Sequence, residues 1–205
     1  MENVKLLQTF AEMTARVDIK MFDVKLNNIM KTEEAFLQSA IKKFKAQKLL
    51  GEKTFAQLDD KDFLFKPSKE SNSIAVIVQH IYGNMLSRWT NFLNEDGEKT
   101  WRERDKEFED ILTTKEDVLN AWEKGWQCVF NALESLLPDD IMKTITIRSE
   151  PLLVVDAIVR QLDHYGSHVG QIIYIGKLIK NEDWQTLSIA KNKSNAYNEA
   201  MHLKK

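Results

Sequence analysis

The 205-residue chain has little of several residue types, and each shortage excludes a class of protein. A single cysteine, Cys128, excludes an internal disulfide framework and suits a reducing compartment. Seven glycines and three prolines leave few positions for tight turns, which favours long helices. The net charge of −2, with acidic and basic residues mixed along the chain, offers no bulk attraction to nucleic acid or to an anionic membrane.

Long uninterrupted apolar runs are also missing. None approaches the ~20 residues that cross a bilayer. The first 29 residues contain Asp18, Asp23 and several lysines, unlike a secretory signal peptide. The chain is 43% hydrophobic and 29% charged, which is the composition of a soluble globular protein. We therefore expect a cytoplasmic protein that binds neither nucleic acid nor a membrane.

Apolar residues recur at helical spacing in four segments, which predicts four long helices. The expected ranges are 32–58, 73–93, 115–137 and 151–180. Ser73 can cap the second helix, Pro138 stops the third, and Pro151 suits the first turn of the fourth. Residues 141–147 alternate apolar and polar side chains, so we expect a brief extended segment there.

This pattern predicts an all-α protein built as a four-helix bundle. We assign residues 30–205 to the bundle domain, including a C-terminal tail. Residues 1–29 combine helical spacing with a short alternating stretch, and we assign them to a short N-terminal extension.

Two of the four histidines, His164 and His168, stand four residues apart in the helix predicted over 151–180. At this spacing two side chains lie one above the other on the same helix face. His80 belongs to the helix predicted over 73–93, in a row of side chains that is polar from its middle onward. Three neutral imidazoles suit Zn²⁺, Ni²⁺ or Fe²⁺, and three protein ligands leave a position open for water or substrate.

The residues alone leave two interpretations of the histidines open, which are metal ligands or core side chains that each find a hydrogen-bond partner. The pair is not the H-E-x-x-H motif of metallopeptidases, because Tyr165 occupies the position of the glutamate base. No carboxylate elsewhere stands out as a general base. Gly83 and Gly166 lie within a turn of the histidines, and we expect them to let the second and fourth helices approach closely.

Polar residues near the histidines are candidates for supporting roles. Asn84 and Gln171 lie one turn from predicted ligands, so we expect them to orient the imidazoles or a bound water. Arg88 is a candidate contact for an anionic group of the substrate, because a guanidinium binds carboxylates bidentately. Alternatively, Arg88, Arg102 and Arg104 pair with nearby acids and secure the loop after the second helix. We expect this pairing for at least two of the three.

Several motifs occur in one order between Leu50 and Asn198. They are Ser71-Asn72-Ser73-Ile74, His80-Ile81-Tyr82-Gly83-Asn84, Trp101-Arg102-Glu103-Arg104-Asp105 and His164…His168-Val169-Gly170-Gln171-Ile172. This combination resembles one branch of the DinB/YfiT-like superfamily, a set of bacterial proteins largely without assigned function. Ser149 stands where the relatives often have glycine.

The resemblance implies an up-down-down-up four-helix bundle, often a homodimer, with a divalent metal on His80, His164 and His168. Better-known relatives are thiol-dependent transferases, such as bacillithiol transferases and the mycothiol-dependent maleylpyruvate isomerase. We therefore expect a metal-dependent enzyme acting on a small-molecule substrate, with the metal activating a low-molecular-weight thiol for transfer or, as second choice, water for hydrolysis. The alternative is a non-catalytic protein, either a metal-binding stress-response protein or a dimeric interaction module.

Overall fold

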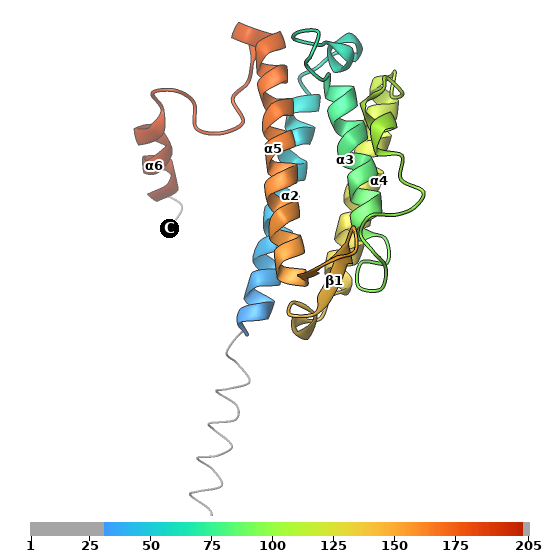
Figure 1. The fold of residues 1–205 in the computed structure, drawn as a ribbon. Coiled ribbons are helices and arrows are strands. Elements are labelled where there is room, and N and C mark those ends of the chain that lie inside the picture. Colours follow the sequence, from blue (N-terminus) through green and yellow to red (C-terminus); the bar gives the residue numbers. More distant parts are fainter. Residues whose placement is uncertain (1–30, 203–205) are drawn as a thin grey trace, which may run out of the picture.

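A computed structural model describes residues 31–202 and shows a mostly helical chain with one small sheet (Figure 1). The helices are α2 (Thr32–Phe55), α3 (Ile74–Trp89), α4 (Lys115–Ser135), α5 (Val154–Lys180) and the short α6 (Ser194–His202). Short 3₁₀ turns are η1 (Asp60–Leu64), η2 (Arg104–Phe108), η3 (Pro138–Asp140) and η4 (Asn181–Asp183). The predicted extension over residues 1–29 lies outside the described residues. Within residues 31–202, no helix has the length and apolarity needed to cross a membrane.

The four longer helices share one core. Helix α3 packs against α4 and α2 against α5, with further contacts between α3 and α5 and between α2 and α4. Each helix contributes one buried aromatic ring to a central cluster, and the clustered ring pairs have centroids 5.7 to 6.1 Å apart. The four rings belong to Phe44, Trp89, Trp126 and Tyr165. Aromatic contacts of this kind stabilise a core beyond the apolar area that they bury.

The buried hydroxyl of Tyr165 joins α5 to α3. It accepts a hydrogen bond from Trp89 Nε1 at 2.9 Å and donates one to Asn84 Oδ1 at 3.0 Å. A buried phenol with both partners present avoids the cost of an unpaired polar group. These two bonds fix how α5 sits against α3 one residue away from His164.

Local signals account for most helix ends. The Ser73 hydroxyl accepts a hydrogen bond from the Val76 N–H at 3.2 Å, so the predicted cap of α3 is confirmed. Helix α3 ends at Trp89, four residues earlier than predicted, because Asn91 adopts a positive φ of 49°. An asparagine tolerates this left-handed conformation better than most residues do. Helix α4 ends at Ser135, shortly before Pro138.

The prediction of an all-α protein is wrong at one place. Strands β1 (Thr144–Ile147) and β2 (Glu150–Leu153) form an antiparallel hairpin between α4 and α5, and β1 falls within the segment expected to be extended. Pro151 lies in β2 opposite Thr146, so it does not start α5, which begins at Val154. A proline is tolerated in a two-stranded sheet because each strand has a free edge. Arg148 and Ser149 form the turn with φ values of 57° and 63°.

Candidate metal centre

The three predicted histidines meet in the structure. Nε2 of His164 lies 3.3 Å from Nε2 of His80 and 3.2 Å from Nε2 of His168. One ring nitrogen from each of the three lies within 4.8 Å of the others. Metal–nitrogen bonds of about 2.0–2.1 Å at tetrahedral angles would place ligand nitrogens about 3.3 Å apart. The spacing of these side chains from α3 and α5 therefore fits one divalent metal.

Hydrogen bonds behind two of the rings fix which nitrogens face the centre. Nδ1 of His80 lies 2.9 Å from Glu107 Oε2, and Nδ1 of His168 lies 2.9 Å from Gln171 Oε1. Because each of these oxygens is an acceptor, Nδ1 carries the proton in both rings and Nε2 presents a lone pair. Carboxylate and carbonyl oxygens are the usual partners of metal-bound histidines. His80 and His168 therefore have the tautomer that leaves Nε2 free to bind a metal.

His164 differs from the other two histidines in its surroundings. Its Nδ1 is buried and has no hydrogen-bond partner in the described part of the chain. Burial, followed by the neighbours His168 and His80, lowers the pKa of His164 to about 3. Burial also lowers the pKa of His168. Both rings are therefore neutral near pH 7, which is the form that binds a metal.

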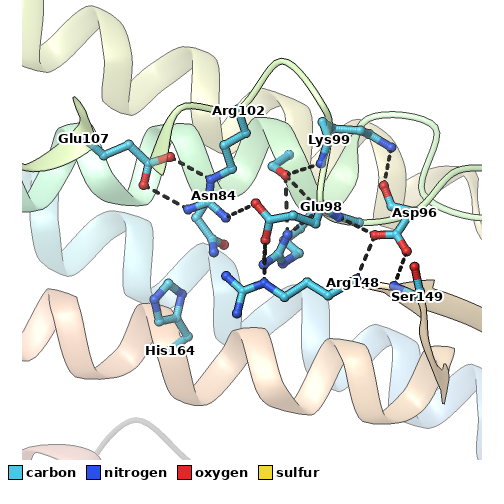
Figure 2. A network of polar contacts seen from close by, with 12 residues as sticks. Asn84, Asp96, Glu98, Lys99, Arg102, Glu107, Arg148, Ser149 and His164 are labelled. Atoms are coloured by element: carbon cyan, nitrogen blue, oxygen red, sulfur yellow. Dashed lines mark hydrogen bonds and ion pairs between the residues drawn. The ribbon is translucent and has the colours of Figure 1, made fainter. Parts of the chain in front are cut away.

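Glu107 is a site residue that sequence reasoning missed. This buried carboxylate lies on η2, and its Oε2 accepts the hydrogen bond of His80. Arg102 donates from Nε to Oε1 at 2.7 Å and from a terminal nitrogen to Oε2 at 2.9 Å (Figure 2). Burial opposes ionisation, but the hydrogen bonds from His80 and Arg102 lower the pKa of Glu107 below its usual value. An ionised carboxylate thus fixes the tautomer of one predicted ligand.

The segment around η2 is packed closely onto α3. The Phe108 ring stacks on the imidazole of His80, with centroids 4.9 Å apart and an interplanar angle of 29°. Gln79, the residue before His80, forms three hydrogen bonds to the backbone of this segment. Its Nε2 donates to the carbonyls of Lys106 and Glu109, both at 2.9 Å, and its Oε1 accepts from the N–H of Leu112 at 3.1 Å.

The role predicted for the two glycines is wrong. A Cβ on Gly83 would lie 2.3 Å from Glu107 Oε1, so Gly83 faces the carboxylate on η2 and not α5. A Cβ on Gly166 would lie 3.0 Å from Nε2 of Gln47 on α2. Neither glycine therefore controls the approach of α3 to α5. Gly83 instead leaves the space in which the Glu107 carboxylate can reach His80.

Of the two polar residues predicted to orient the histidines, Gln171 contacts one of them and Asn84 does not. Gln171 contacts His168, as described above. Asn84 lines a cavity with His80 and His164, but it bonds to Tyr165, and within the described residues no hydrogen bond joins it to a histidine.

Two of the three predicted arginines hold the loop after α3. Arg88 is buried and donates to the Gly97 carbonyl and, at 2.9 Å, to Glu98. Arg102 bonds to Glu107, so the expected pairing with acids is confirmed for these two. Arg104 is exposed, and its guanidinium carbon lies 5.2 Å from the centroid of the Phe108 ring.

A second carboxylate organises the hairpin turn. Asp96 accepts hydrogen bonds from the N–H groups of Glu98, Arg148 and Ser149 at 2.7, 2.8 and 2.7 Å (Figure 2). Burial opposes ionisation, but these bonds lower the pKa of Asp96 to about 2. The charge stabilises two consecutive residues with positive φ, a conformation that costs energy for residues other than glycine. Ser149 is one of these two residues.

Comparison with known proteins gives a family but no activity. Residues 31–193 match the model of a family described as "Protein of unknown function (DUF1572)". No curated protein matches the chain. The match spans α2 to α5 and therefore includes every residue of the candidate centre.

Proposed function

Because the chain belongs to the DUF1572 family of unknown function, its activity must be inferred from the site, and we propose a metal-dependent enzyme acting on a small molecule. His80, His164 and His168 would hold one Zn²⁺, Ni²⁺ or Fe²⁺ ion. A metal there would lower the pKa of a coordinated thiol or water, which supports thiol transfer first and hydrolysis second. The observation that carries the proposal is the spacing of 3.2 and 3.3 Å between the three Nε2 atoms.

The residues around the histidines have distinct tasks in this proposal. Glu107 and Gln171 accept the Nδ1 protons of His80 and His168 and so keep both Nε2 atoms available as ligands. Phe108 covers one face of the His80 ring and restricts its rotation. The ligands are thus oriented before a metal arrives, which reduces the ordering that binding would otherwise require.

A cavity beside the histidines favours an enzyme over a purely structural metal site. Its volume is about 490 Å³, and His80 and His164 both line it. Pockets for small molecules span about 300–1,000 Å³, so the space suits a compact substrate. A non-catalytic metal-binding protein, the alternative function, would need no such cavity next to its ligands.

We also propose that α2 to α5 form a DinB-like four-helix bundle. The shared aromatic core of these helices supports this arrangement, as does the origin of the three histidines on α3 and α5. If the relationship holds, a low-molecular-weight thiol is the first co-substrate to test. A cytoplasmic homodimer remains part of the same proposal.

Metal analysis of the purified protein tests the central claim. The parent should carry close to one equivalent of a divalent metal, and His80→Ala, His164→Ala and His168→Ala should each lose it. His202→Ala, at an exposed position on α6, is the matched control and should keep it. Metal content that is unchanged in any of the three variants removes that residue from the site. If the parent binds no divalent metal, the proposal is wrong.

Activity assays then separate the two functions. The metal-loaded protein is mixed with low-molecular-weight thiols and a panel of electrophiles, and the loss of free thiol is followed. Turnover by the parent that disappears in His164→Ala supports a transferase. Stoichiometric metal without turnover of thiols or hydrolysable substrates supports the non-catalytic alternative.

A further inference from the structure

The cavity beside the histidines is lined by arginines. Five of the six arginines in the chain line it, and the sixth, Arg16, lies outside the described residues. The sequence has 23 lysines, yet none is among the described residues that line the cavity. The five are Arg88, Arg102, Arg104, Arg148 and Arg160. Unlike lysine, arginine has a planar guanidinium group whose N–H donors can bind two oxygens of one carboxylate or phosphate at the same time.

Carboxylates compensate only part of this charge. Glu98 and Glu107 bind Arg88 and Arg102, whose guanidinium groups are thereby committed to the protein. Asp163 is the acidic residue among those that line the cavity. Five guanidinium groups therefore face three carboxylates, which leaves an excess of two positive charges at the cavity before any metal is added.

The remaining arginines keep donors available. Arg160 on α5 and Arg104 on η2 are exposed and form no ion pair within residues 31–202. Arg148 bonds to Glu98 through Nε at 2.9 Å, and within the same residues its terminal nitrogens have no carboxylate partner. Figure 2 shows the Arg148 side chain extending from the hairpin turn toward Asn84 and His164. The backbone of Arg148 is held in place, because Asp96 accepts hydrogen bonds from the N–H groups of Arg148 and Ser149.

A buried amide at the cavity also lacks a partner. Gln161 lies on α5, one turn before His164, and is only 3% exposed. Its Oε1 is buried without a hydrogen-bond partner in the described part of the chain, although the residue lines the cavity. An unpaired buried amide oxygen is costly, and because it is an acceptor only a hydroxyl or N–H group of a ligand could recover that cost.

We propose that the cavity binds its substrate through an anionic group, a carboxylate or a phosphate, held by Arg148 and Arg160, while Gln161 Oε1 can accept a hydrogen bond from a hydroxyl or N–H group elsewhere on the substrate. This inference rests on the proposed function, because the rest of the substrate would then face His80 and His164. The cavity of about 490 Å³ can hold a compact molecule. The arginines of the cavity wall would thus bind the anionic group, and the histidines would lie beside the part of the substrate that reacts.

Titration calorimetry with inorganic phosphate and with succinate as probes tests this proposal on the full chain, both metal-loaded and metal-free. At least one probe should bind at one equivalent, and the stronger of the two identifies the preferred anionic group. Arg160→Gln is the cleanest variant, since Arg160 forms no ion pair in the described residues that could be lost. Losing one bidentate charged contact should weaken binding about tenfold or more. Arg160→Lys keeps the positive charge but cannot form the bidentate contact, so it should recover only part of the affinity.

Controls separate this proposal from the metal proposal. Lys177→Gln removes one exposed positive charge of α5 away from the cavity and should change affinity by less than about twofold, since a distant surface charge is screened. All of these variants should keep the metal content of the parent. If neither probe binds, or if Arg160→Gln and Lys177→Gln weaken binding equally, the anion site is refuted. Anion binding by a protein that holds no metal would refute the metal proposal alone.

Discussion

Replacing Gly83 by alanine should weaken the metal site through a residue that touches no metal. The new Cβ would lie 2.3 Å from Glu107 Oε1 and 2.7 Å from its Cδ. The carboxylate must therefore move by about 1 Å to reach ordinary contact distance. Its bonds to His80 and Arg102 are 2.7 to 2.9 Å long, so a shift of this size takes at least one beyond hydrogen-bonding range.

The size of the effect follows from these contacts. Losing a hydrogen bond to a charged group costs about 1.5–3 kcal/mol. An alanine within a helix contributes about 1 kcal/mol relative to glycine. The free energy of unfolding of the metal-free protein should therefore fall by about 1 kcal/mol in Gly83→Ala. Metal affinity should fall further, by about 10–100-fold, because His80 loses the partner that orients it.

Gly170→Ala is the matched control, because it also lies on a helix of the site and a Cβ there meets no atom within 4 Å. It should raise the free energy of unfolding by up to about 1 kcal/mol and leave metal affinity unchanged. Urea unfolding of the metal-free proteins and competition with a chromophoric chelator measure the two quantities.

A double-mutant cycle tests the route of the effect. In the Glu107→Ala background the added Cβ has no carboxylate to displace, so Gly83→Ala should no longer lower metal affinity. The reasoning is refuted if Gly83→Ala binds metal as tightly as Gly170→Ala does. An effect of equal size in both backgrounds would contradict it as well.

Three further predictions concern the hairpin turn and the histidines. Asp96→Asn leaves one acceptor where the carboxylate offered two, so the free energy of unfolding at pH 7 should fall by about 1–2 kcal/mol in urea titrations, a modest value because the side chain is only partly buried. Since the pKa of Asp96 is lowered to about 2 in the folded state, its contribution is present above about pH 4 and lost toward pH 2, and the difference between parent and variant should shrink over that range. Ser149→Gly relieves a positive φ of 63° and should raise the melting temperature, corresponding to about 0.5–1 kcal/mol; no gain would mean that the turn is unstrained. The free energy of unfolding of the metal-free protein should fall as the pH falls from about 6.5 toward 3, because over this range the histidine is protonated in the unfolded chain and His164 is neutral in the folded protein. In His164→Asn the free energy of unfolding should depend less on pH over this range.

The histidines could be predicted because their signal is local. His164 and His168 share a helix face by spacing alone, and His80 stands in a polar row on another helix. The cap at Ser73 was also readable, since a hydroxyl before an apolar run has a defined partner three residues on.

Glu107 could not be predicted because its role depends on how a loop packs. It comes 27 residues after His80, in a segment where neighbouring acids face solvent and nothing in the residue order tells which carboxylate turns inward. The extended segment over residues 141–147 was predicted, but its pairing with β2 in a hairpin was missed for a similar reason. Arg148 and Ser149 carry positive φ without a glycine, and the charge that stabilises them comes from Asp96, more than fifty residues earlier.

The three hydrogen bonds of Gln79 also limit how this protein can vary in length. One amide contacts the backbone at Lys106, Glu109 and Leu112, so the number of residues between these positions is set by the reach of a single side chain. Adding or deleting a residue there would shift Glu107 and Phe108 away from His80. Length differences among homologous sequences should therefore avoid residues 106–112 and accumulate elsewhere, such as between α5 and α6.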